Sequence, residues 1–121
     1  MILIDTSLWI DHFKRPDPRI AVLIAQGALV HHPFVTGELA VGTIHPRRRT
    51  ILLLRNLPQL EVADEDAFYD YMNEHDLAGK GMGFVDIHLL VAASASGARV
   101  WTRDQRMIEH APRIGLRLAD G

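Results

Sequence analysis

The chain has 121 residues, with 13 Lys or Arg against 15 Asp or Glu and a formal net charge of -2. This length is typical of one domain, here 1–121, and a hydrophobic content of 48% suffices for a buried core. The charge balance excludes a chain that is basic overall, so any nucleic-acid contact must be local. The lack of cysteine excludes disulfides and thiolate metal sites and fits a reducing cytoplasm. No apolar run approaches the ~18 residues that span a bilayer, so we expect a cytoplasmic protein without a membrane segment.

The first half of the chain is predicted to hold two strands and four helices. In chain order these are a strand at 1–4, helices at 8–13 and 20–25, a strand at 29–31, and helices at 33–42 and 46–57. The run MILI at 1–4 is short and wholly apolar, which is typical of a buried parallel strand. Thr6 or Ser7 can cap the first helix, and Pro58 ends the last helix of this half.

The second half continues the alternation of strands and helices. In chain order it is predicted to hold a strand at 60–62, helices at 64–75 and 83–96, a strand at 99–101, a helix at 104–110 and a last strand at 115–118. Acids at 64–66 favour a helix start because of the helix dipole, and Gly97 ends the long apolar helix. Short apolar strands that alternate with helices indicate an α/β fold with a parallel sheet covered on both faces.

Four acidic residues are predicted to meet at one edge of this sheet. Asp5 ends the first strand, and Asp104 follows the strand at 99–101. Glu38 and Asp86 lie early in helices that follow a strand or a glycine-rich loop. Because ligands of such folds bind outside the carboxyl ends of the strands, we expect these four side chains to share a binding site.

A site of four carboxylates needs a cation or protons. Two like charges at ~4 Å repel by roughly 4 kcal/mol at an effective dielectric of 20, so four together either take up protons or bind a cation. Mg²⁺ prefers oxygen ligands and retains water molecules. The pattern therefore predicts a site for one or two metal ions, where a metal-activated water attacks a phosphodiester.

Each acid also has an ordinary structural interpretation. Asp5 and Asp104 can be simple helix caps, and Glu38 can be a solvated helix residue. Asp86 can cap its own helix, although the run GFVDIHLLVAA at 83–93 is apolar nearly all round. The joint placement of the four acids favours the metal site over these separate roles.

Four motifs resemble the PIN-domain family, and more narrowly the VapC-type toxins of bacterial type II toxin–antitoxin pairs. They are IDTSLWID at 4–11, VTGELAVG at 35–42, GFVDIHLLVAA at 83–93 and WTRD at 101–104. The resemblance implies a three-layer α/β/α domain with a short, mainly parallel central sheet. It also implies an endoribonuclease that depends on Mg²⁺ or Mn²⁺ and cleaves structured RNA, either tRNA or rRNA.

The same resemblance implies roles for particular residues and partners. The catalytic and metal-binding quartet would be Asp5, Glu38, Asp86 and Asp104. Hydroxyl groups of Thr6, Ser7 or Thr102 would support it by hydrogen bonds. The family further implies a homodimer, inhibited by a cognate antitoxin protein of which one segment lies across the active-site groove.

Several cationic residues are candidates for contact with RNA phosphates. Arg103 and Arg106 flank Asp104, and Lys80 lies in the glycine-rich loop GKGMG. The densest cluster is Arg47, Arg48 and Arg49, with Arg55 nearby; such a local patch would offset the weakly acidic total. The alternative for this cluster is a solvated helix start.

Trp9, Ile10 and Phe13 fall on one helix and indicate either core packing or an interface with a second subunit or the antitoxin. The seven histidines show no zinc-binding spacing such as HExxH, and none is given a catalytic role.

Two other functions share parts of this pattern. A phosphorylation receiver domain has a similar length and an acidic Mg²⁺ pocket, but here the central stretch TILLLRNLPQLEV contains no Asp and DTS replaces the acidic pair. A non-catalytic RNA-binding or scaffold PIN domain would lack some of the four acids. RNA cleavage that is lost on chelation and restored by Mg²⁺ or Mn²⁺ separates the enzyme from both.

Overall fold

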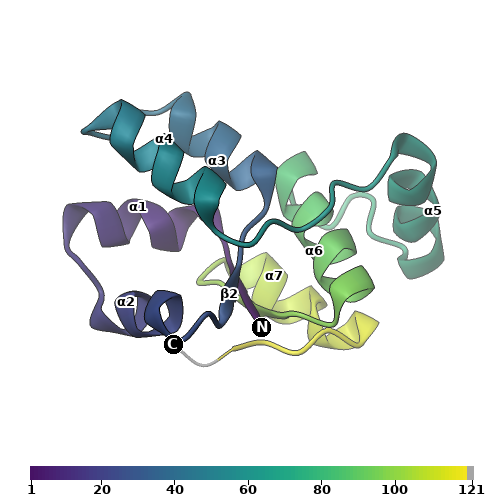
Figure 1. Ribbon diagram of the computed structural model, residues 1–121. Helices are drawn as coiled ribbons and strands as arrows, with labels where there is room; N and C mark the ends of the chain where they lie inside the picture. The colour runs from purple at the N-terminus through teal and green to yellow at the C-terminus, as the bar shows by residue number, and fades with distance from the viewer. Residues whose placement is uncertain (120–121) are drawn as a thin grey trace.

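The computed structural model describes residues 1–119 as helices around a small parallel sheet (Figure 1). The sheet has the strand order β2-β1-β3, formed by β1 (Ile2–Ile4), β2 (Leu29–Val30) and β3 (Arg99–Trp101). The helices are α1 (Thr6–Lys14), α2 (Pro18–Ala25), α3 (Pro33–Ala40), α4 (Arg47–Asn56), α5 (Glu65–His75), α6 (Phe84–Ser96) and α7 (Gln105–His110), and a 3₁₀ helix (Pro112–Ile114) follows. The predicted α/β class is confirmed.

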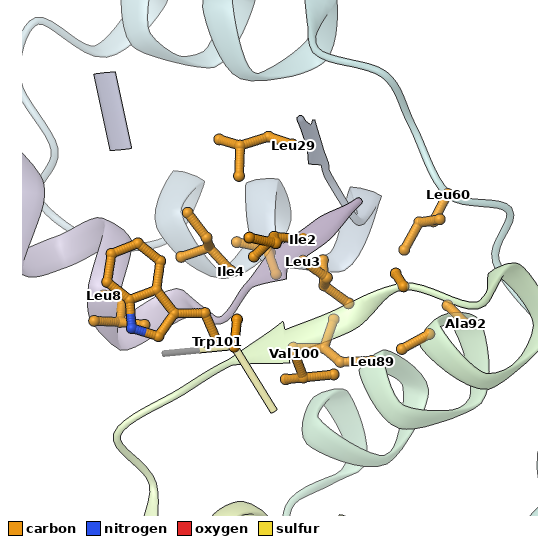
Figure 2. Close-up of a cluster of buried hydrophobic side chains, with 14 of the residues drawn as sticks. Ile2, Leu3, Ile4, Leu8, Leu29, Leu60, Leu89, Ala92, Val100 and Trp101 are labelled. Atoms are coloured by element: carbon orange, nitrogen blue, oxygen red, sulfur yellow. The ribbon is translucent and has the colours of Figure 1, made fainter. Parts of the chain in front are cut away.

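The central strand β1 lies inside the molecule. It pairs in parallel with both neighbours, so that Leu3 stands opposite Val30 on one side and Val100 on the other. Figure 2 shows the β1 side chains surrounded by Leu29, Val100 and residues of α6. Leu3 and Val100 have no exposed surface, as expected for a parallel strand covered on both faces.

The predicted strands at 60–62 and 115–118 are wrong. Each region makes only an isolated parallel bridge, His31 with Gln59 and Val100 with Leu118. The first cannot extend through 60–62 because its partner segment ends at His31, shortly before α3 begins at Pro33. The second follows directly on the 3₁₀ helix, which leaves room for a single bridge.

Helix α6 separates two apolar clusters, which explains why its sequence is hydrophobic nearly all round. One side packs on the sheet core through Leu89, Leu90 and Ala93. The other side packs through Ile87 and Val91 on a smaller cluster that includes residues of α5, the helix at the right of Figure 1. Among residues 1–119, no helix is long and apolar enough to cross a membrane.

Candidate functional site

Asp5 is the most enclosed of the four predicted acids. It follows β1, is 4% exposed and forms the N-cap of α1, so α1 begins at Thr6 and neither Thr6 nor Ser7 is the cap. Its Oδ1 accepts hydrogen bonds from the Leu8 amide at 3.2 Å and from the Ser7 hydroxyl at 2.8 Å. Its Oδ2 accepts from the hydroxyl of Thr102. These donors fix the orientation of the carboxylate at the end of the central strand.

Thr102 links Asp5 to Asp104. While its hydroxyl donates to Asp5, its oxygen accepts from the backbone amide of Asp104 at 2.9 Å. Asp104 caps α7, with Oδ1 accepting from the amides of Arg106 at 2.8 Å and Met107 at 3.2 Å. The ends of the neighbouring strands β1 and β3 therefore hold their two carboxylates in one hydrogen-bonded arrangement.

Glu38 is brought to the same place by α3. Its Oε1 accepts a hydrogen bond from the Thr6 hydroxyl at 2.6 Å, although 32 positions separate the two residues. Thr6 directly follows Asp5, so this bond places Glu38 beside the end of β1. The side chain of Glu38 is exposed and lines a cavity with Ile10 and Phe13.

Asp86 is half-buried in the first turn of α6. Its Oδ2 accepts from the Gly83 amide at 3.1 Å, which closes the start of the helix. Burial raises the pKa of Asp86, and the charges of Asp104, Glu38 and Asp5 raise it further against the opposing Gly83 hydrogen bond. Because charge repulsion falls with distance, repulsion by all three acids agrees with the expectation that the four lie near one another.

The four carboxylates have the donor chemistry of a hard-metal site without enclosing an ion completely. Among residues 1–119, no three His, Asp or Glu side chains are spaced to hold a metal ion together. Within the same residues, the second oxygens of Glu38, Asp86 and Asp104 accept no hydrogen bond from the protein. Mg²⁺ is commonly held by one or two carboxylates together with water and substrate oxygens, so the donor set fits such an ion.

No cation of the described chain neutralises these acids. None of the ion pairs found among residues 1–119 involves Asp5, Glu38, Asp86 or Asp104. The site therefore carries uncompensated negative charge, which is the condition that favours binding of a metal cation.

Two of the predicted RNA-contact residues lie next to the acids. Arg103 forms an ion pair with Asp11 of α1 at 2.6 Å. Arg106 packs its guanidinium directly on Gly81, in the loop before α6, where a β-carbon would have no room. Sequence reasoning gave no role to Asp11, although it ends the IDTSLWID motif.

The other predicted RNA contacts show no contact with the four acids among residues 1–119. Lys80 pairs with Asp76 at 3.6 Å in the loop after α5. Arg47, Arg48 and Arg49 are exposed at the start of α4, and Arg49 lines an apolar cavity rather than the acidic site.

The aromatic residues of α1 divide between core and surface. Trp9 is 3% exposed and belongs to the core, whereas Ile10 and Phe13 remain 39% and 36% exposed. Trp9 stacks on Phe13 with ring centres 5.8 Å apart. Ile10 and Phe13 can therefore contact a partner protein, whereas the buried Trp9 cannot.

The buried histidines serve the packing. His31 shares a hydrogen bond with the Thr36 hydroxyl at 2.7 Å, and His88 stacks on Phe68 with ring centres 4.3 Å apart. Burial lowers the pKa of His31 and of His32 to about 4. These rings lie within the core and are not part of the acidic site.

Comparison with known proteins gives consistent results. The sequence model of the family described as PIN domain matches residues 2–113. Ribonuclease VapC32 of Mycobacterium tuberculosis, in strains CDC 1551 and H37Rv, is 40% identical over 121 residues, covering 99% of this chain and 98% of the relative.

Solved structures with the same fold cover the whole chain. VapBC-1 from nontypeable Haemophilus influenzae matches with a TM-score of 0.71 and 20% identity, over 99% of this chain and 98% of that one. FitAcB from Neisseria gonorrhoeae matches with a TM-score of 0.61 and 15% identity, over 99% and 97%. FitAB bound to an IR36 DNA fragment matches with a TM-score of 0.60 and 16% identity, over 98% and 94%. These likenesses confirm the predicted three-layer architecture.

Proposed function

The chain belongs to the PIN domain family, and from this membership we propose that it is the toxin of a toxin–antitoxin pair, an endoribonuclease that depends on Mg²⁺ or Mn²⁺. The identity to a VapC ribonuclease over nearly the whole chain supports the activity. The observation that carries the proposal is the hydrogen-bonded arrangement in which Thr102 binds Asp5 and the Asp104 amide while Thr6 binds Glu38. The pKa of Asp86, raised by burial and further by the other three acids, agrees with it. Such a concentration of uncompensated carboxylates is typical of a functional site.

The residues that would hold the metal are Asp5, Glu38, Asp86 and Asp104. Their oxygens suit one or two divalent ions, and the free oxygens of Glu38, Asp86 and Asp104 are the available ligand atoms. A bound divalent ion would supply an ionised water at neutral pH and would stabilise negative charge on the departing oxygen.

The protein's own contribution is to orient these groups. Thr102 holds Asp5 and the Asp104 backbone in one arrangement, and Thr6 holds Glu38 against the start of α1. The reaction is hydrolysis of a phosphodiester of RNA, in which a water oxygen bonds to phosphorus while one ester P–O bond breaks. Structured RNA, either tRNA or rRNA, is the proposed substrate.

The exposed apolar side chains near Glu38 suit the antitoxin. Ile10 and Phe13 line a cavity of about 390 Å³ that also includes Glu38. A second cavity of about 500 Å³ lies between α1, α2 and α4, with Phe13, Ile24 and Leu53 in its lining. Exposed apolar patches of this kind typically mark sites of protein association. An antitoxin segment seated in the first cavity would also cover Glu38 of the acidic site. The toxin itself would form a homodimer.

The decisive experiment measures RNA cleavage by the purified protein after chelation with EDTA and after addition of Mg²⁺ or Mn²⁺. Cleavage that disappears with EDTA and returns with either ion supports the proposal. Asp5→Asn should remain inactive in both ions while keeping the wild-type circular dichroism spectrum. RNA binding without cleavage in any metal would instead identify a non-catalytic scaffold.

A further inference from the structure

A pocket lined by basic residues lies at the turn that joins α1 to α2 and includes Arg103, the residue before Asp104. The turn is at the left side of Figure 1. Its volume is about 530 Å³, within the range of small-ligand sites. Lys14, Arg15 and Arg103 are its cationic lining residues. We infer that this basic pocket binds a backbone phosphate of the RNA adjacent to the bond that is cut, an inference that rests on the proposed function.

The acids that line the basic pocket are already paired. Asp11 pairs with Arg103 at 2.6 Å, and Asp17 pairs with Arg19 at 2.7 Å. The carboxylates are therefore neutralised from within the protein, and they offer little opposition to an incoming anion.

Two cations of the basic pocket have no acidic partner. Among residues 1–119, neither Lys14 nor Arg15 takes part in an ion pair, and both side chains are exposed. His12 adds no positive charge near pH 7, since burial lowers its pKa. The lining thus has a positive excess, and a phosphate oxygen is the ligand that Arg and Lys bind most readily.

Two lining residues of the basic pocket, Leu8 and Arg103, also border the acidic site. Leu8 lines the pocket, and its amide donates a hydrogen bond to Asp5. Arg103 lines it from the other side and is the residue directly before Asp104. A polynucleotide whose scissile phosphate lies at the acids therefore has a neighbouring phosphate within reach of the pocket.

The basic pocket also reduces the electrostatic repulsion between the acidic site and an RNA substrate. Four carboxylates repel an RNA backbone, and a cationic group beside them offsets that repulsion. The Arg103–Asp11 pair is half-exposed, with 55% and 53% of the side chains accessible. Arg103 binds Asp11 through Nη1, and a guanidinium carries five N–H donors, so Arg103 can also donate to a phosphate while its pair with Asp11 stays intact.

The test replaces the two unpaired cations together, as Lys14→Gln/Arg15→Gln. Binding of fluorescein-labelled bulk tRNA, a mixed probe of backbone contacts, is followed by fluorescence anisotropy over a range of KCl concentrations. The double variant should bind roughly tenfold more weakly. The slope of log K against log salt should become shallower by about 0.7 for each phosphate that the variant no longer neutralises. In cleavage assays its KM should rise while kcat stays unchanged.

The matched control is Arg99→Gln/Arg117→Gln, which removes two exposed cations that also lack ion-pair partners among residues 1–119. Arg99 lies at the amino end of β3, away from the acids. This control should retain the wild-type salt slope. A wild-type slope in Lys14→Gln/Arg15→Gln, in a protein that still cleaves RNA, would overturn the phosphate subsite alone. Wild-type protein that neither binds nor cleaves RNA would overturn the proposed function and the subsite together.

Discussion

The hydroxyl of Thr102 donates a hydrogen bond to Asp5, which lies 97 positions earlier in the chain. The same oxygen accepts the backbone amide of Asp104. One side chain thus joins the carboxyl ends of β1 and β3 and sets the relative position of two acids.

Replacement of this hydroxyl should damage both stability and activity. Thr102→Val keeps the shape of the side chain but leaves an Asp5 oxygen and the Asp104 amide without their partner. Because Thr102 is buried, we expect a loss of about 1–3 kcal/mol in the free energy of unfolding. Urea denaturation measures this loss, and RNA cleavage should fall with it. Thr102→Ser retains the hydroxyl and should keep most of both; a Ser variant as damaged as the Val variant would show that the methyl group contributes as much as the hydroxyl.

Neutralising Asp86 should separate stability from activity. Its folded-state pKa is raised by burial and by three acids, so ionisation costs the fold stability as pH rises above the unfolded value. Asp86→Asn should therefore increase Tm at pH 7 by a few degrees while abolishing cleavage. Asp70→Asn, an exposed change on α5, should leave Tm and cleavage unaltered. An Asp86→Asn protein that cleaves RNA at the wild-type rate would refute the assignment of the acidic quartet.

The contact between Gly81 and Arg106 should be sensitive to a single methyl group. Gly81 has φ +83°, and an added β-carbon would collide with the Arg106 guanidinium. Gly79 has φ +72° but open space around it, so Gly79→Ala carries the backbone strain alone, about 1 kcal/mol. Gly81→Ala carries the same strain and also displaces Arg106. The KM for RNA cleavage is measured for both variants, and the difference between them reports the effect of displacing Arg106. If Gly81→Ala and Gly79→Ala have the same KM, Arg106 does not contact the substrate.

The buried histidines predict a loss of stability in mild acid. The pKa values of His31 and His32 are about 4 in the folded chain, against 6.5 without burial. The unfolded chain therefore binds more protons between these values, and the free energy of unfolding falls as pH drops from about 6.5 to about 4. Thermal melts across this range should show the decline. His32→Asn keeps an acceptor for the Phe34 amide, which His32 now caps, and should flatten the curve; an unchanged curve would place the pH dependence elsewhere.

The exposed face of Phe13 should matter for the antitoxin rather than for RNA. Phe13 lines both apolar cavities beside α1. Phe13→Ser should weaken the antitoxin complex by about 2 kcal/mol, as expected for an aromatic anchor, and should leave cleavage by the free toxin intact. Isothermal titration calorimetry with the purified cognate antitoxin measures the change in binding free energy. Val22→Ser, also exposed but on α2, is the control and should bind as tightly as the wild type; a Phe13→Ser variant that also binds like the wild type would locate the interface elsewhere.

Much of the architecture follows from local sequence pattern. The apolar run at 1–4, the proline at position 33 and the uniform hydrophobicity of 87–93 predicted β1, α3 and α6 at nearly their observed positions. Local pattern failed at 60–62 and 115–118, because a strand depends on the length of its hydrogen-bonded partner. Both segments reach the sheet for one bridge only.

Three of the four candidate acids were singled out from sequence because Asp5 and Asp104 follow strands and Asp86 opens a helix. Glu38 was expected early in its helix, but it lies near the end of α3. The interactions of these acids were not identifiable from sequence, because the partners lie far apart in the chain. The bond of Thr6 to Glu38, the bond of Thr102 to Asp5 and the pairing of Arg103 with Asp11 connect segments 32 to 97 positions apart.

The sequence alone therefore determined the alternation of elements and the family, and it supplied the four candidate acids, since these depend on residue type and on spacing of a few residues. Only the tertiary structure decided which hydroxyl holds which carboxylate, which cations lie beside the acids and which stay unpaired. Those outcomes depend on distances between side chains that meet through packing of the sheet and its helices, and electrostatic and hydrogen-bond energies vary steeply with such distances.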